Sequence, residues 1–389
     1  MLIYNKLTLF TNTAVTISYF EEANIILQIL YIYIYSFFKI NNNNMNSRTA
    51  LFAAFGAAVA SAGLTKLGSS SPEVLKELFE EFKAEHRSNY RTMDDENYRF
   101  GVFVKTLHII DERNAAEDGS LHGITRFADM TQEEFQSKYL DMNIASKIRG
   151  TNATIVQVPA YTGSSTSADY VGTQTTPVKD QGQCGSCFAF AAAEQIESDG
   201  MRLLGNDASI TLSVQQIVSC DHGEGQLGCE GGGLQEMTFD YVRDNGGITT
   251  DDAYPYTATT GRCDKTKNDY VMGVTKYDMI RTEDIPQSAE AIESTEADFA
   301  SYVLSTGTLS IGVGKLIFFL IYVGNLLMNS PSLYVVDATT WSTYKGGVMS
   351  NCGKGTDINH SVQVVGVDTD SETGYWKIRN SWVSFACCN

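Results

Sequence analysis

The residues with the clearest chemical potential lie in a glycine-rich stretch, residues 181–190, which reads QGQCGSCFAF. Ser186 is a good N-cap residue and the run after it favours helix, so we expect Cys187 in the first turn of a helix. Unpaired backbone N–H groups at that end of a helix favour negative charge, and the thiolate is the nucleophilic form of cysteine. The stretch therefore predicts a nucleophile at Cys187.

The second cysteine of this stretch, Cys184, leaves several interpretations open. Its spacing of three residues from Cys187 also fits a redox pair, half of a zinc site, or a disulfide loop at the start of a helix. Gly182 and Gly185 would let another backbone approach closely, as a bound peptide does. These residues alone do not decide between a catalytic and a structural role.

A histidine and an asparagine late in the chain supply the partners that such a nucleophile needs. His360 precedes a strand-like run at 362–367, and Asn380 lies in residues 375–382, which read YWKIRNSW. An imidazole can hold a thiolate as an ion pair and then protonate the leaving amine, while an amide side chain fixes the orientation of the ring. A lone histidine before a strand is more often structural, so the interpretation depends on all three residues together.

Taken in order, these segments resemble the papain-like cysteine proteases, whose nucleophile region usually reads QGxCGSCW. Phe188 stands where that pattern has Trp, and it keeps an aromatic ring at the start of the helix. The resemblance implies four catalytic residues: Cys187, His360, Asn380 and Gln181. Gln181 would bind the developing oxyanion together with the backbone N–H of Cys187, and Trp382 would shield the pair from water. It implies no cofactor and no metal.

The same resemblance assigns the middle of the chain. Residues 228–232 read GCEGG and are similar to the family's GCxGG, which makes Gly231 and Gly232 an edge for substrate backbone and Leu234 an apolar wall. A plain turn is the alternative for these glycines. The resemblance implies two disulfides, namely Cys184–Cys229 and Cys220–Cys263.

Upstream of the nucleophile, residues 71–142 resemble the inhibitory propeptide of cathepsin L-like proteases. Arg99, Phe103, Ile110 and Asn114 follow its ERFNIN spacing, and residues 123–129, GITRFAD, are similar to its GxNxFxD. The implied organisation is a propeptide at 71–142, a linker at 143–167 and a catalytic domain at 168–389. The implied fold is α+β, with a helical domain and an antiparallel β-barrel-like domain.

Four regions depart from this organisation or precede it. Residues 1–44 are of low complexity and are interpreted as a spurious leader, while residues 45–62 have the form of a signal peptide. Residues 314–334 are interpreted as an insertion. The pattern stops soon after Trp382, so we expect a truncated second domain that lacks the usual partner of Cys352 and an inactive chain as written.

Composition limits the class of protein. The chain has 389 residues, of which 43% are hydrophobic and 19% charged, and this indicates a globular protein. A net charge of −18 argues against nucleic acid as a partner. The expected partners are protein or peptide substrates and the chain's own propeptide, without a stable membrane span, in the secretory pathway, a lysosome or digestive vacuole, or outside the cell. The rival hypotheses are an inert propeptide-type inhibitor or decoy of cysteine proteases and a membrane protein.

Overall fold

The computed structural model describes residues 66–86, 90–116, 119–140, 154–205, 209–223, 225–267, 269–280, 289–313, 338–349, 359–371 and 374–382. The chain divides into two compact units, residues 1–89 and 90–389. The expected leader, signal peptide, insertion and terminal tail lie outside the described residues, as does Cys352.

The described part of the first unit is a short 3₁₀ turn, η1 (Leu67–Ser69), and helix α3 (Pro72–His86). Proline suits the first turn of a helix because it has no N–H to leave unpaired. Phe79 and Phe82 are buried, with their rings stacked at 6.2 Å. Val74, in the first turn of the same helix, is 43% exposed.

The second unit contains the following described elements in chain order: α4 (Met93–Asn114), β1 (Ser120–His122), α5 (Gln132–Tyr139), β2 (Thr154–Ile155), β3 (Ser167–Asp169), α7 (Cys187–Leu204), α8 (Val214–Cys220), α9 (Gln235–Asn245), η3 (Lys265–Lys267), β4 (Asp278–Met279), α10 (Ala289–Ser305), β5 (Leu309–Val313), η4 (Ala338–Thr343), β6 (Tyr344–Gly347), β7 (His360–Asp368) and β8 (Tyr375–Arg379).

Helix α4 carries the ERFNIN-like residues and fixes the strand that follows it. Phe103 and Ile110 are fully buried. The side chain of Asn114 donates to the carbonyl of His122 at 2.9 Å and accepts from the same residue's N–H at 2.8 Å. This pair of bonds holds strand β1, which pairs antiparallel with β6. The propeptide-like segment therefore adds a strand to the part of the chain expected to be catalytic.

The helical part of this unit is built around α7, α8 and α9. Their apolar side chains form one core that includes Phe188, Ile196 and Val218. The side chain of Ser213 accepts from the N–H of Gln216 and so caps α8. Two disulfides, Cys184–Cys229 and Cys220–Cys263, close the loops around this core.

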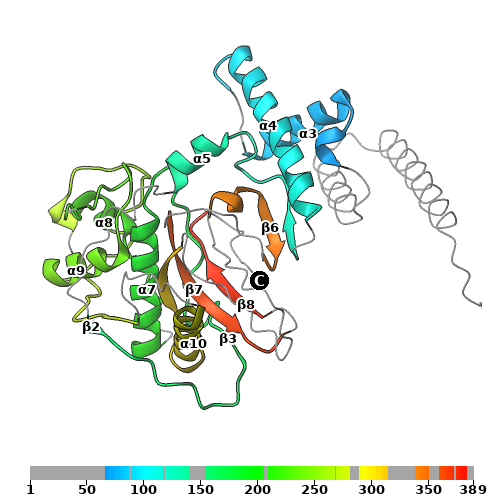
Figure 1. The fold of residues 1–389 in the computed structure, drawn as a ribbon. Coiled ribbons are helices and arrows are strands. Elements are labelled where there is room, and N and C mark those ends of the chain that lie inside the picture. The colour runs from blue at the N-terminus through cyan, green and yellow to red at the C-terminus, as the bar shows by residue number, and fades with distance from the viewer. Residues whose placement is uncertain are drawn as a thin grey trace, which may run out of the picture. The chain divides into compact units, whose positions relative to one another are not determined.

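The sheet part has the strand order β3-β7-β5, with β8 paired to β7 (Figure 1). Helix α7 packs against β7, which places the helical part beside the sheet. Strands β7 and β8 are antiparallel, with Gln363 opposite Arg379 and Val364 opposite Ile378. The start of β7 therefore lies at the same end of the sheet as the residues after β8, and the architecture is α+β as expected.

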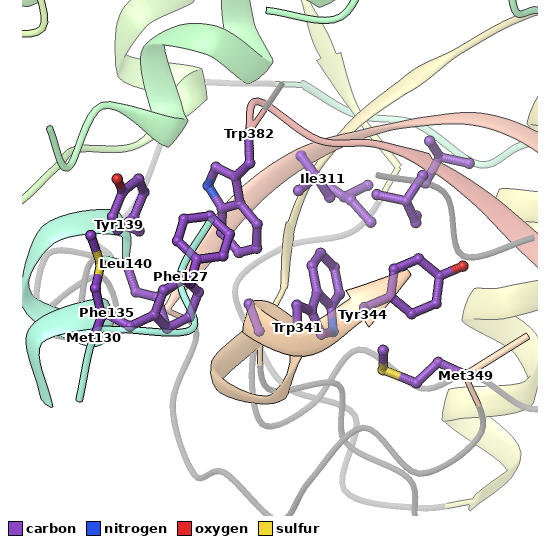
Figure 2. Close-up of a cluster of buried hydrophobic side chains, with 14 of the residues drawn as sticks. Phe127, Met130, Phe135, Tyr139, Leu140, Ile311, Trp341, Tyr344, Met349 and Trp382 are labelled. Atoms are coloured by element: carbon purple, nitrogen blue, oxygen red, sulfur yellow. The ribbon is translucent and has the colours of Figure 1, made fainter. Parts of the chain in front are cut away.

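A second core lies between this sheet and the segments before the nucleophile. It joins Val362, Val364 and Ile378 of the sheet to aromatic residues of α5 and of the loop before it (Figure 2). No described helix is long and apolar enough to cross a membrane.

Candidate active site

Cys187 is the first residue of α7 and is fully buried, outside both disulfides. Its position at the helix N-terminus agrees with the sequence pattern. Ser186 stands at the N-cap, but its side chain makes no capping bond, contrary to expectation. The Ser186 hydroxyl instead lies 2.7 Å from the hydroxyl of Tyr256, which itself donates to the carbonyl of Gln181 at 2.8 Å. Ser186 therefore joins the nucleophile loop to a neighbouring loop.

His360 and Asn380 come together at the end of the sheet described above. The His360 Nε2 lies 2.8 Å from the Asn380 Oδ1, and the indole of Trp382 stacks on the imidazole at 4.8 Å. Nδ1 is buried and has no hydrogen-bond partner within the described residues. Burial lowers the pKa of His360 to about 4, although the bond to Asn380 favours the charged form. The buried imidazole is therefore neutral at pH 7.

The side chain of Gln181 is held at both ends of its amide. Its Oε1 accepts from the Ser381 hydroxyl at 2.7 Å and from the Trp382 indole N–H at 2.9 Å. This fixes which way the amide points, so Nε2 is the end left to donate. It donates to the carbonyls of Cys184 at 2.9 Å and Tyr139 at 3.1 Å. A backbone carbonyl from α5 therefore occupies the donor that the resemblance assigns to an oxyanion.

The expected substrate-binding glycines lie beside Gly185 of the nucleophile loop. Gly231 and Gly232 have φ of +132° and +74°, values that side chains rarely adopt. A Cβ on Gly185 would lie 3.2 Å from the Cys229 carbonyl and 3.6 Å from the Gly232 nitrogen, so the two loops approach closely. Leu234, just before α9, is 4% exposed.

Three aromatic side chains of the propeptide-like segment cover the indole of Trp382. Phe127, Phe135 and Tyr139 meet it edge-on, at centroid distances of 5.6, 5.3 and 6.4 Å. Figure 2 shows Phe127 and Tyr139 beside this indole. Edge-on aromatic pairs each add about 0.5–1.5 kcal/mol beyond the area they bury. The indole that stacks on His360 is therefore itself covered by three side chains from residues 127–139.

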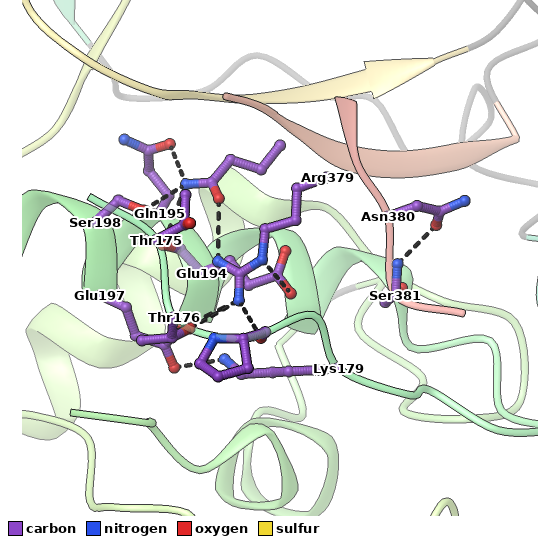
Figure 3. A network of polar contacts seen from close by, with 12 residues as sticks. Thr175, Thr176, Lys179, Glu194, Gln195, Glu197, Ser198, Arg379, Asn380 and Ser381 are labelled. Atoms are coloured by element: carbon purple, nitrogen blue, oxygen red, sulfur yellow. Dashed lines mark hydrogen bonds and ion pairs between the residues drawn. The ribbon is translucent and has the colours of Figure 1, made fainter. Parts of the chain in front are cut away.

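Sequence reasoning missed a buried ionic network behind the site (Figure 3). The guanidinium of Arg379 on β8 donates to the Thr176 hydroxyl and the Pro177 carbonyl, both at 2.7 Å. It also lies 3.5 Å from a Glu194 oxygen and 3.9 Å from a Glu197 oxygen, on α7. A usable signal was present, because two glutamates three residues apart follow directly on an apolar run at the start of the helix, residues 187–193.

Comparisons with known proteins agree with this architecture. The family model described as papain family cysteine protease matches residues 164–324 and 322–385, and the cathepsin propeptide inhibitor domain matches residues 79–135. Cysteine proteinase 2 of Leishmania pifanoi is 31% identical over 357 residues, covering 86% of this chain and 69% of that protein. The senescence-specific cysteine protease SAG39 of Oryza sativa subsp. japonica is 31% identical over 351 residues, covering 86% and 89%.

Solved structures show the same likeness. The digestive procathepsin L 3 of Tenebrio molitor larval midgut has a TM-score of 0.60 and 25% identity, covering 80% of this chain and 90% of that chain. The recombinant stem bromelain precursor also has a TM-score of 0.60, with 26% identity, covering 79% and 87%.

The fold and the two matched domains define a papain-like protease with an inhibitory propeptide. This chain belongs to the papain family of cysteine proteases, in its cathepsin L-like branch. It is a cysteine endopeptidase made as a zymogen.

Proposed function

We propose that Cys187, His360 and Asn380 form the catalytic site that hydrolyses peptide bonds. The arrangement that supports this most directly is the 2.8 Å bond between His360 Nε2 and Asn380 Oδ1. It fixes the ring so that the buried Nδ1 remains available for a thiol. The Cys187 sulfur attacks the substrate carbonyl as a thiolate, and His360 gives its proton to the leaving amine. Water then hydrolyses the thioester with His360 as the base.

The side-chain amide of Gln181 and the backbone N–H of Cys187 donate hydrogen bonds to the substrate carbonyl oxygen as negative charge develops on it. The amide of Gln181 is oriented before substrate arrives, because Ser381 and Trp382 both donate to its Oε1. A preoriented donor does not need to reorganise when negative charge develops on the carbonyl oxygen, which is the usual source of its catalytic effect. Gly231, Gly232 and Leu234 bind the acyl half of the substrate.

The propeptide holds this site closed in two ways. The Tyr139 carbonyl accepts from Gln181 Nε2, and the aromatic cover on Trp382 keeps water from His360. Burial disfavours the charged imidazole, so the thiolate–imidazolium pair is disfavoured while the cover remains. Removal of residues 71–142 through the linker at 143–167 opens the catalytic domain that begins near residue 168. Such a zymogen suits the secretory pathway and a lysosome or digestive vacuole.

The experiment that tests this assignment is covalent labelling. A peptidyl epoxide added to the acid-activated chain should modify Cys187, because this thiol combines a helix N-terminus with a histidine partner. Mass spectrometry of the digested protein locates the label. Labelling of Cys352 at an equal rate would contradict the assignment.

A second prediction concerns release of the propeptide by acid. Arg99 donates to both oxygens of Glu134, at 2.6 and 2.9 Å, and this bond lowers the pKa of Glu134 below its ordinary value of 4.5. A lowered pKa gives stability that is present in full above pH 4.5 and is lost as pH falls through the folded value. The ion pair joins α4 to α5, so it stabilises the inhibitory fold of the propeptide at neutral pH and weakens that fold when it is lost in acid.

We expect Glu134→Gln to raise the rate of autoprocessing at neutral pH by about twofold to fivefold, in the range of a partly exposed ion pair. The dependence of that rate on pH should also flatten. Glu133→Gln is the matched control, because Glu133 lies one residue away on the exposed face of α5. Identical pH profiles for the Glu134 variant and the unaltered chain would contradict the proposed switch.

A further inference from the structure

One carboxylate beside the site, that of Asp180, takes no part in the proposed reaction. Asp180 directly precedes Gln181, and it forms an isolated antiparallel bridge with Trp382. Its Oδ1 accepts from the Gly182 N–H at 2.9 Å. The backbone bridge and this bond fix the carboxylate, so that its other oxygen, Oδ2, has a set direction.

Arg126 of the propeptide forms an ion pair with that oxygen. Its guanidinium donates to Asp180 Oδ2 at 2.9 Å and lies over the rings of Phe127 and Tyr139, at 5.4 and 5.8 Å. These aromatic side chains belong to the cover on Trp382, so the arginine reaches Asp180 from within the blocking segment. The side chain of Asp180 remains 40% exposed even with this partner present. Removal of the propeptide therefore uncovers a prearranged site for a cation.

The position of Asp180 along the nucleophile loop decides which half of a substrate it meets. At the other end of the loop, Gly185 lies against Gly231 and Gly232, the residues to which the proposed function assigns the acyl half of the substrate. Asp180 lies at the Trp382 end, where the imidazole of His360 stacks on the indole. His360 protonates the leaving amine, so this end of the site holds the residues after the scissile bond.

We propose that Asp180 is a specificity-determining residue that selects an arginine or lysine at the first or second position after the scissile bond. This inference rests on the proposed function, and it assigns a preference on the leaving-group side of the same site. A carboxylate and a guanidinium in a partly exposed site form a charge-assisted hydrogen bond. Arg126 is the internal occupant that a substrate cation replaces after processing.

The test compares peptide substrates that differ in one group. The acid-activated full chain is given peptides with arginine or citrulline at the first or second position after the cut, and kcat/KM is measured for each. Citrulline has the shape of arginine without its charge. We expect the arginine peptide to be cleaved about fivefold to tenfold faster at one of these positions, a moderate preference for a partly exposed pair.

Variants assign that preference to Asp180. Asp180→Asn should bring the ratio of kcat/KM for the arginine peptide to that for the citrulline peptide close to one. Asp180→Lys should lower this ratio below one, and a peptide with glutamate at the same position should then be cleaved faster than either. Asp199→Asn is the matched control, since Asp199 has a similarly exposed side chain and pairs with Arg202 on the same helix, three residues away. Its ratio should equal that of the unaltered chain.

The outcomes distinguish the role of Asp180 from the assignment of the protease site. A ratio near one in the unaltered chain, or a ratio that survives Asp180→Asn, overturns the role of Asp180 and leaves the protease assignment standing. Absence of hydrolysis of every peptide, both by the chain as written and by a variant that lacks residues 314–334 and carries a family-like C-terminal tail, overturns the proposed function and this inference with it. The comparison of arginine with citrulline uses the unaltered chain, so it tests the proposal even if Asp180→Asn folds poorly.

Discussion

Replacement of Cys187 by serine is expected to reduce kcat/KM for any peptide substrate by at least about 10⁴-fold, and to abolish labelling by a peptidyl epoxide. Serine has nearly the same shape, but its hydroxyl is not ionised at the pH at which the thiolate forms, so no activated nucleophile remains. Loss of a nucleophile that acts together with its base removes most of the catalytic effect in one step. The measurement is hydrolysis by the acid-activated chain.

The fold should survive this change, because the side chain at position 187 is fully buried and the substitution is close to isosteric. An unaltered thermal unfolding midpoint would show that. Asn380→Ala should cost less, about 10–100-fold, because Asn380 acts through a single bond that positions the imidazole. Asp199→Asn again serves as the control on α7. Hydrolysis that persists in Cys187→Ser would exclude this residue as the nucleophile.

The sequence predicted the elements that carry the proposed catalytic residues, because the order of these segments along the chain matches a recognised pattern. The helix at Cys187, the strand after His360 and the segment before Asn380 all form where local signals place them. The α+β class followed from the same resemblance. Each of these predictions depends on short segments whose structure is largely local.

The contacts that close the site could not be predicted, because they join residues far apart in the chain. The Tyr139 carbonyl reaches Gln181 across 42 positions, and Arg126 reaches Asp180 across 54. The failed cap at Ser186 has the same cause, since its hydroxyl bonds to Tyr256, 70 positions away. Local propensity favours a capping bond there, and a tertiary partner takes the hydroxyl instead.

The last prediction concerns Arg379, which joins the sheet to the helix that carries Cys187. Arg379, Glu194 and Glu197 are 3%, 1% and 0% exposed. Glu197 has a further cation, because Lys179 forms an ion pair with it. Glu194 depends more on Arg379, and burial raises its pKa to about 7 even though Arg379 and Lys179 favour the charged form. The arginine therefore compensates a carboxylate that is costly to ionise.

We expect Arg379→Met to destabilise the protein by about 3–5 kcal/mol, since methionine fills space but leaves the buried carboxylate of Glu194 without its ion-pair partner. Against a typical total stability of about 5–15 kcal/mol, this loss is large. Activity should fall as well, because the bonds of Arg379 fix the backbone at the end of β8, and this backbone positions Asn380, the next residue. Denaturant unfolding at pH 7 measures the first effect, and kcat measures the second.

A companion substitution tests whether the carboxylate is the cause. Because the pKa of Glu194 is raised, its contribution to stability is full below the ordinary value of 4.5 and is lost as pH rises through about 7. Glu194→Gln should therefore remove the part of the stability loss that occurs between about pH 4.5 and 7. The double variant with Arg379→Met should be more stable than Arg379→Met alone, with a coupling of about 1–3 kcal/mol. If the two changes instead add without coupling, Arg379 stabilises the site through Thr176 and Pro177, and the link from β8 to α7 is not ionic.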